Sequence, residues 1–344
     1  MTRIAVGTEK GAYVLEDTSG GWDVTGPLFP GWKVTAFGQA PDGNHLAAVG
    51  SNWFGVGIHR SPDFVSWEQT DSPPAWPEET GRSMEQIWTL HTRGEHIWAG
   101  VAHAGLFTSV DNGLTWDPVA GLNEHRTRGE WQPGLGGLCA HRVAIDGETQ
   151  WVAISAVGVF RSDDGGGTWE PKNDGVAAVG LPDDAPRPEV GYCVHCLAHD
   201  TADQRRIWRQ DHSGVYRSED GGDNWERIEE GLPSNFGFVM WRDDESRRLF
   251  TIPLEADSNR VPVDGALRVY RSDDDGASWS ISGSGWSDAP QFTGVLRGAF
   301  DGDGRGVFCF GTTGGRIWLT RDNGDTWDEL DASFPRIGAI RVLG

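Results

Sequence analysis

Lysine is the scarcest charged residue of this chain. Only Lys10, Lys33 and Lys172 are present among 344 residues, and 51 acidic residues face 29 basic ones, so the formal net charge is −22. A surface of this sign repels nucleic acid and anionic membranes. The composition therefore argues against both kinds of partner, and we expect no nucleotide cofactor.

Cysteine and long apolar runs are scarce as well. The chain has four cysteines, Cys139, Cys193, Cys196 and Cys309, which do not resemble the disulfide framework of a small secreted domain. No window approaches 18 apolar residues, and the N-terminus lacks the apolar core of a signal peptide. We therefore expect a cytoplasmic protein without a membrane segment.

Tryptophan and glycine, by contrast, are abundant, with 18 and 49 copies. Together with a hydrophobic content of only 37%, they favour many short strands joined by tight turns. One pattern recurs: Ser or Thr, any residue, Asp, any residue, Gly, any residue, a small polar residue, Trp. Near-complete copies occupy 109–116, 162–169, 218–225, 272–279 and 320–327, and reduced copies occupy 17–22 and 61–67.

Seven tryptophans close these boxes, and their spacing defines a repeat. The spacings are 45, 49, 53, 56, 54 and 48 residues, and each unit reads as four strands without helical periodicity. In the turn, Asp accepts backbone N–H groups, Gly takes a positive φ, and Trp packs between sheets. Four-stranded units of this length predict a β-propeller. The closing residues are Trp22, Trp67, Trp116, Trp169, Trp225, Trp279 and Trp327.

The sequence thus predicts an all-β fold, a seven-bladed β-propeller of four-stranded blades, in one domain over 1–344. The N-terminal strands within 1–26 lack an inner strand, and the strand at 336–343 has no strands after it. We expect the two segments to share one blade, so that the C-terminal strand closes the ring.

The boxes resemble the Asp-box (BNR) repeats of sialidases, sortilin-type domains, certain xyloglucanases and photosystem II assembly-factor-like propellers. The resemblance spans essentially the whole chain. It implies that each box lies between the two outer strands, remote from the central pocket, and has a structural role. A calcium loop is the weaker interpretation, because the downstream acidic ligand is missing.

The similarity to sialidases ends at the scaffold. Those enzymes use an Arg triad, a Tyr nucleophile paired with Glu, an Asp acid/base and an aromatic-Arg-Ile-Pro motif. Here the N-terminal TRIAVG keeps only Arg3 and Ile4 of that motif. Of the four tyrosines, only Tyr192 begins an inner strand. The chain therefore lacks the residue set of a sialidase.

Two adjacent first strands share the pattern Gly-x-Cys-x-His. It pairs Cys139 with His141 in GLCAHRVAI, and Cys193 with His195 in the segment GYCVHCLAH. Residues two apart lie on one side of a strand, and the first strands of a propeller line its channel. We therefore expect both pairs near the channel mouth.

Thiolate and imidazole are good ligands for copper, zinc or iron, so the pairs predict a transition-metal site. The expected ligands are Cys139, His141, Cys193, His195 and His212, the last from a turn on the same face. One alternative is plain packing, because cysteine is often buried and histidine can bond backbone carbonyls. Another is a cysteine nucleophile with a histidine base.

Two long connections are expected over the same face. The segments 121–137 and 254–270 exceed what a bare link requires, and long loops over a pocket are often functional. The expected ligand-binding residues are His103, His125, Arg126 and Trp131. Candidate catalytic groups are the rim acids Glu124, Glu130, Glu189, Asp211 and Glu255, together with Tyr192. The alternative for each acid is solvated surface charge.

Three functions remain compatible with these residues. The first is a small-molecule or metal site at the channel mouth, in an enzyme with metal-dependent redox or hydrolytic chemistry. The second is a glycoside hydrolase or glycan-binding propeller that uses rim carboxylates, with Trp53 and Trp131 as platforms for a glycan ligand. The third is a non-catalytic scaffold that binds a protein or peptide.

Overall fold

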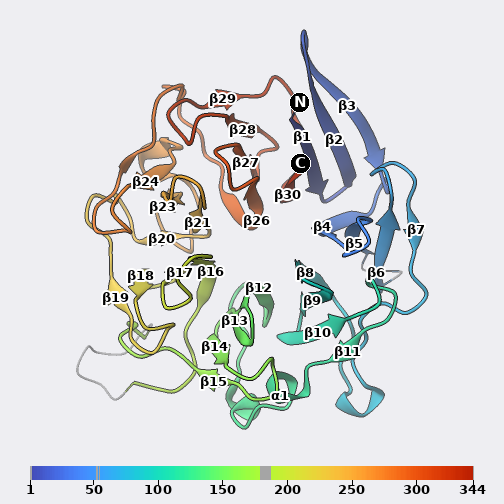
Figure 1. Cartoon of the computed structure of the whole chain (residues 1–344). Helices are drawn as coiled ribbons and strands as arrows, with labels where there is room; N and C mark the ends of the chain where they lie inside the picture. The colour runs from blue at the N-terminus through green and yellow to red at the C-terminus, as the bar shows by residue number, and fades with distance from the viewer. Residues whose placement is uncertain (1, 52, 54, 179–186, 344) are drawn as a thin grey trace.

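Short antiparallel strands make up almost all of the regular structure. The computed structural model describes residues 2–51, 53, 55–178 and 187–343 (Figure 1). The helical elements are α1 (Ala120–Asn123), η1 (Glu78–Thr80), η2 (Arg128–Glu130) and η3 (Val263–Gly265). The predicted all-β class is therefore confirmed. Within the described ranges, no helix is long and apolar enough to cross a membrane.

Five four-stranded antiparallel sheets follow one another along the chain. The first contains β4 (Lys33–Gln39), β5 (His45–Ser51), β6 (Gly55–Ser61) and β7 (Glu68–Gln69), and the second contains β8 (Ile87–Arg93), β9 (His96–Val101), β10 (Gly105–Ser109) and β11 (Asp117–Pro118). The third contains β12 (Ala140–Asp146), β13 (Thr149–Ile154), β14 (Gly158–Ser162) and β15 (Glu170–Pro171), and the fourth contains β16 (Val194–His199), β17 (Ile207–Asp211), β18 (Gly214–Ser218) and β19 (Glu226–Arg227). The fifth contains β21 (Trp241–Arg242), β22 (Leu249–Thr251), β24 (Tyr270–Ser272) and β25 (Ser280–Ile281). The short strands β20 (Phe236–Gly237) and β23 (Pro253–Leu254) pair separately.

The two ends of the chain meet in one further, eight-stranded sheet. It contains β26 (Val295–Gly302), β27 (Phe308–Thr312), β28 (Ile317–Thr320), β29 (Asp328–Glu329), β30 (Ile337–Leu343), β1 (Arg3–Thr8), β2 (Gly11–Thr18) and β3 (Gly21–Leu28). β30 pairs antiparallel with β1, and a single parallel bridge, Gly298 to Ala339, joins β26 to β30. The sheets lie around a common centre with their first strands innermost (Figure 1). This arrangement is that of a β-propeller.

Each complete box forms the turn between the third and fourth strands of a sheet. In the box at 162–169, the Asp164 carboxylate accepts the backbone N–H of Thr168 at 2.8 Å and its hydroxyl at 2.7 Å. The Ser162 hydroxyl donates to the same carboxylate at 2.8 Å and accepts the N–H of Gly166 at 2.8 Å. The boxes therefore satisfy their own polar groups, which is the structural role that the resemblance implies.

Three closing tryptophans, Trp225, Trp279 and Trp327, each bond to the sheet before their own. The indoles of Trp116 and Trp169 instead donate to a glycine of their own box. The indole of Trp279 donates to the carbonyl of Ile228 at 2.8 Å, and its backbone N–H donates to Glu230 at 2.8 Å. Gly231 lies directly below, with a φ of 92°, and a Cβ there would stand 2.1 Å from the Trp279 carbonyl oxygen. Trp225 makes the equivalent two bonds to the sheet before it. These contacts fix the spacing of neighbouring sheets.

A β-bulge occurs at the same place in four inner strands. The unpaired residue is Thr35 in β4, Trp88 in β8, His141 in β12 and His195 in β16. A bulge adds one residue to a strand and turns its side chain out of the regular alternation. The bulge thus decides which side chains of each inner strand point along the channel.

The boxes generate a pH-dependent prediction, for Asp111. Slight burial alone would raise the pKa of this carboxyl, but hydrogen bonds from Thr115, Ser109 and Leu114 lower it to about 2. Because the folded pKa lies below the unfolded value of about 3.9, the stabilisation exists above about pH 4 and is lost toward about pH 2. We expect Asp111→Asn to cost at most ~1 kcal/mol of unfolding free energy at neutral pH, since solvent screens the site.

Urea unfolding of the wild type and of the Asp111→Asn variant measures this difference. The two midpoints should differ at neutral pH and converge below about pH 2. Asp117→Asn, an exposed acid just beyond the same turn, is the control and should leave the midpoint unchanged. A difference that stays constant across the pH range would contradict the role given to the carboxylate.

Candidate functional site

The starts of the inner strands surround a cavity of about 180 Å³, here called the mouth cavity. It takes residues from β1, β4, β8, β12, β26 and β30, so it lies at the centre of the propeller. The segment 254–270 also reaches it, through Arg260. That placement agrees with the expectation that this insert lies over the channel.

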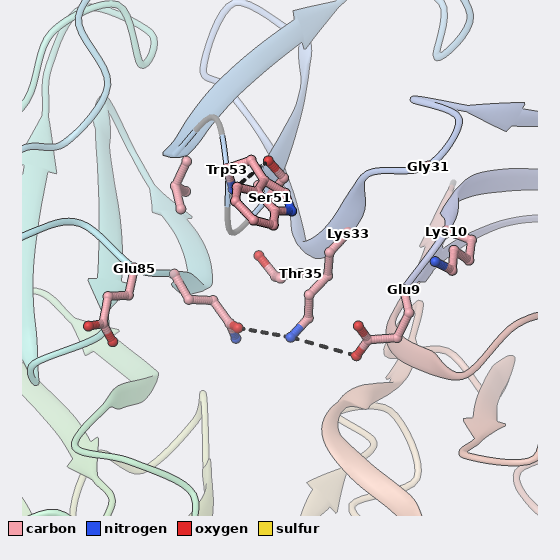
Figure 2. Close-up of a pocket in the computed structure, with 11 residues that line it drawn as sticks. Glu9, Lys10, Gly31, Lys33, Thr35, Ser51, Trp53 and Glu85 are labelled. Atoms are coloured by element: carbon pink, nitrogen blue, oxygen red, sulfur yellow. Dashed lines mark hydrogen bonds and ion pairs between the residues drawn. The ribbon is translucent and has the colours of Figure 1, made fainter.

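A neighbouring pocket of about 280 Å³ opens beside the mouth cavity (Figure 2). The two share Lys33, whose ammonium lies 3.0 Å from the side-chain oxygen of Gln86 and 3.7 Å from the carboxylate of Glu9. Trp53 stands at the edge of the pocket with 89% of its surface exposed. The mouth therefore offers charged, amide and aromatic groups to one ligand.

Positive charge gathers at this mouth although the chain as a whole is acidic. Lys33, Arg260, Arg297 and Arg336 line the mouth cavity, where Glu9 is the one acidic lining residue. An arrangement of this kind attracts anions and concentrates them locally.

Arg297 is the most unusual of the four cations. Its guanidinium lies over the ring of Phe238, 4.8 Å from the ring centroid, and its Nε is buried without a hydrogen-bond partner in the described part of the chain. Burial lowers the pKa of Arg297. A charged donor of this kind is stabilised when an anion accepts its hydrogen bonds.

Three predicted metal ligands come together close to Arg297. Single ligand atoms of Cys193, His195 and His212 all lie within 4.8 Å of one another, and Cys193 Sγ is 3.6 Å from His195 Nε2. A sulfur and a nitrogen bound tetrahedrally to one zinc ion stand roughly 3.5 Å apart, given bonds of about 2.3 and 2.0 Å. The pair already has the separation that a shared metal ion requires.

The surroundings of His195 favour the form that binds a metal. Its Nδ1–H donates to the carbonyl of Gly237 at 2.6 Å, so Nε2 carries the free lone pair that faces Cys193. Burial and the charge of Arg297 hold the pKa of His195 well below its ordinary value, and burial raises the pKa of the Cys193 thiol. The thiol must therefore lose its proton when a metal binds.

The bulge gives the histidines of both Cys-x-His pairs a structural role as well. His141 Nε2 donates to the carbonyl of Val194 at 2.8 Å, across to the next inner strand, as His195 does to Gly237. Thr35, at the same bulge position of β4, donates to the carbonyl of Ile87 at 2.6 Å. A hydrogen bond between neighbouring sheets therefore accounts for His141 without a metal.

The remaining cysteines are not part of this cluster, although Cys139 lies beside it, where Ser155 bonds to both Cys139 and Cys193. Cys139 is buried, and burial raises the pKa of its thiol to about 11. Cys196 follows Cys193 at Cys-x-x-Cys spacing, but its sulfur lies 3.4 Å from the carbonyl oxygen of Met240 within an apolar cluster. Cys309 is fully buried in another apolar cluster. The five expected ligands thus reduce to three that meet.

Two candidate catalytic residues are in the wrong place for that role. Tyr192 is fully buried, and its hydroxyl donates to the carbonyl of Pro188 at 2.9 Å. Asp211 is fully buried in an ion pair with Arg209. Asp211 was expected at an open rim and Tyr192 at the start of an inner strand, but both side chains are buried and their polar groups are already bonded.

The first part of the connection, 121–131, is anchored on the sheet, whereas Gly136 in its second part lines the mouth cavity. Trp131 is only 6% exposed and donates to the Thr127 hydroxyl at 2.9 Å, so it cannot serve as a sugar platform. His125 is buried between Thr127, at 2.8 Å, and the carbonyl of Trp169, at 3.1 Å. The aromatic residues of this connection anchor it on the sheet, which corrects the ligand-binding expectation for both.

The other expected rim residues are exposed. Arg126 forms ion pairs with Glu189 and Glu170 on the surface. Glu255 lies in a shallow depression with Pro233 and accepts a hydrogen bond from Asn259. The exposed acids of the connection are Glu124 and Glu130. These positions fit solvated surface charge, which was the alternative interpretation.

His103 lies close to the mouth. Its Nε2 is 3.2 Å from the carboxylate of Glu85, which lines the pocket of Figure 2. No local pattern in the sequence singles out the cations Lys33, Arg260, Arg297 and Arg336 as site residues. For lysine, its rarity in the sequence could have pointed to the site, because two of the three lysines, Lys10 and Lys33, line this one pocket.

We predict that His141→Leu destabilises the fold by about 1–3 kcal/mol, because the buried carbonyl of Val194 loses its donor. Trp88→Phe is the matched control at the same bulge of β8: it removes an indole N–H that has no partner in the described structure, so we expect a loss below ~1 kcal/mol. Chemical denaturation measures both. Equal losses in the two variants would show that the hydrogen bond to Val194 is not the cause.

Comparison with known proteins supports the repeat and the fold. The model of the BNR/Asp-box repeat matches residues 160–171. A search of curated protein sequences finds no match. The GH74 xyloglucanase of Xanthomonas campestris superposes with a TM-score of 0.62 at 17% identity, over 98% of this chain and 52% of that one. The chain thus spans about half of that enzyme.

Two structures of YCF48 superpose as well. YCF48 bound to D1 peptide has a TM-score of 0.53 at 13% identity, over 86% of this chain and 81% of that one. YCF48 from Cyanidioschyzon merolae has a TM-score of 0.54 at 10% identity, over 89% and 88%. Identities this low establish the fold alone. The chain thus contains a BNR/Asp-box repeat and has the β-propeller fold that these structures share.

Proposed function

We propose that the chain is a single seven-bladed β-propeller, closed by β30 and β1, that binds a small anionic molecule at the mouth of its channel. The proposal is supported chiefly by the convergence of Cys193, His195 and His212 beside a cavity lined by four cations and one acid. Both groups of residues belong to the inner strands and the turns above them.

The cluster supports a transition-metal ion, copper, zinc or iron, as the cofactor. A Cys-His-His set supplies soft and borderline ligands, and three protein ligands leave a coordination position open. A bound ion would supply Lewis-acid or redox chemistry at that position. His195 is held in place by Gly237, and Cys193, whose pKa is raised by burial, would lose its proton to the bound ion.

The cations that line the mouth cavity indicate that its ligand is negatively charged. Arg297, without a carboxylate partner in the described structure, is the group best placed to bind an oxyanion of the ligand. Lys33 and Arg260 lie on other sides of the same cavity. The chain's own residues would therefore bind and orient an anionic molecule close to the Cys/His cluster.

A glycan is the second candidate ligand. Trp53, 89% exposed beside a pocket that contains Glu9 and Glu85, has the position of a sugar platform with acids close by. The fold shared with a xyloglucanase favours this alternative. The peptide bound to YCF48 favours the remaining one, a scaffold for a protein segment on the same face.

Elemental analysis of chelator-free protein, loaded with copper, zinc or iron in turn, tests the metal proposal. We expect about one ion per chain for the preferred metal, and loss of that ion in Cys193→Ala and His212→Ala. Cys139→Ala is the matched control and should retain the metal, because Cys139 lies outside the cluster. Absence of stoichiometric metal under every condition, or equal loss in Cys139→Ala, would remove the metal site.

The glycan alternative makes its own prediction. If a sugar stacks on the exposed indole, Trp53→Ala should weaken binding of xyloglucan oligosaccharides by roughly tenfold or more. Because the side chain is 89% exposed, thermal stability should not change. Calorimetric titration measures the affinity, with Trp131→Phe as a buried-tryptophan control. A blank oligosaccharide panel with the wild type would reject the alternative.

A further inference from the structure

The inner strands surround a second cavity at the other end of the channel. This opposite cavity has a volume of about 290 Å³ and is lined by the ends of β8, β12 and β16, residues 89–93, 142–145 and 197–199. Arg341 of β30 and Asp301 of β26 complete the wall. It has no lining residue in common with the mouth cavity, so the two are separate.

Arginine dominates the charge of the opposite cavity. Four arginines and two aspartates line it: Arg93, Arg142, Arg242, Arg341, Asp244 and Asp301. Arg242 is matched by acids, at 3.0 Å from buried Asp200 and 3.2 Å from Asp244.

Of the three remaining arginines, Arg93 is exposed, and Arg142 and Arg341 are poorly matched by acids. Arg341 lies 3.7 Å from Asp301, a carboxyl whose pKa is raised by burial. Arg142 donates through Nε to the carbonyl of Leu197 at 3.2 Å and has no carboxylate partner among the residues described. The cavity therefore holds a surplus of positive charge.

Two histidines of the same wall have buried ring nitrogens without partners. Nε2 of His91 and Nε2 of His199 are both buried, and neither makes a hydrogen bond within the described structure. Burial, together with the charges of Arg142 and Arg341, lowers the pKa of His91 to about 3. A buried polar atom without a partner is rare and calls for an explanation such as an absent ligand.

We propose that the opposite cavity is a second binding site, which holds a phosphate group between Arg142, Arg341, His91 and His199. The donors come from four different strands, β12, β30, β8 and β16, around the channel axis. A tetrahedral oxyanion accepts hydrogen bonds from several directions, whereas a carboxylate accepts them in one plane. Donors spread around an axis therefore fit phosphate better.

The phosphate can belong to inorganic phosphate or to a phosphorylated small molecule. The cavity of about 290 Å³ is larger than a phosphate ion requires, so it has room for part of a larger molecule. Nothing in this site depends on the metal or ligand proposed for the mouth, and each can fail without the other.

Imidazole nitrogen NMR of the full-length chain, titrated with inorganic phosphate, reports on this site directly. We expect the ring signals of His91 and His199 to shift with a dissociation constant of about 1 mM or below. His125, which lines neither cavity and is held by Thr127 and the Trp169 carbonyl, serves as the internal reference. Signals of His91 and His199 that stay unmoved at saturating phosphate would overturn the proposal.

Arginine variants test the donors. Arg142→Gln and Arg341→Gln should each weaken phosphate binding by roughly tenfold or more, the value of one charge-assisted hydrogen bond. Arg142→Lys, which keeps the charge, should lose less. Arg205→Gln, an exposed arginine paired with Asp203, is the matched control and should bind as the wild type does. Unchanged binding in the Arg142→Gln, Arg341→Gln double variant would reject these donors.

Three further measurements distinguish the possible phosphate ligands from one another and the opposite cavity from the mouth cavity. A sugar phosphate that binds more tightly than inorganic phosphate would assign a phosphorylated small molecule, and the reverse order would assign the free ion. Malonate, a planar dicarboxylate, should bind more weakly than either, and tighter malonate binding would overturn the phosphate assignment. Arg297→Gln, at the mouth cavity, should leave the His91 and His199 shifts unchanged. If Arg142→Gln fails to fold, the wild-type titration alone decides.

Discussion

The hydrogen bonds that Trp225, Trp279 and Trp327 make to the preceding sheet fix the positions of the sheets from β12 to β29. Each sheet has only short strands, and its outermost strand often has two residues, so a sheet alone would bury little apolar surface. Trp279 and Trp225 insert between sheets and bond the backbone of the preceding unit, while the box aspartates satisfy the turn that carries them. Because neighbouring sheets are locked in this way, the inner strands stand at fixed positions around the centre.

The inner strands then determine which chemistry reaches the channel. At the recurring bulge, Thr35, His141 and His195 leave the regular alternation and bond a carbonyl of the next sheet. The same device therefore strengthens the contact between sheets and orients side chains toward the mouth. His195 does both, since one ring nitrogen bonds Gly237 while the other faces Cys193.

Electrostatics divides the molecule into an acidic exterior and a cationic interior. The chain carries a net charge of −22, yet arginine and lysine prevail among the charged residues of both central cavities. Arg297 at one end and Arg142 at the other lack carboxylate partners among the described residues. Burying cations without matched acids is costly, so a fold that retains them at its centre is suited to bind anions there.

Local patterns in the sequence were enough to predict the all-β propeller, because the box, its glycine and its tryptophan act over a few residues and repeat. The strands around Cys139 and Cys193 were placed correctly for the same reason. Which side chains lie together at the channel, however, depends on the tertiary structure. Lys33, Arg260 and Arg297 come together from distant strands, and one bulged residue changes which side chains of a strand face the channel. The burial of Trp131, Tyr192 and Asp211 likewise depends on how the sheets pack, and the spacing of residues in the sequence does not predict that packing.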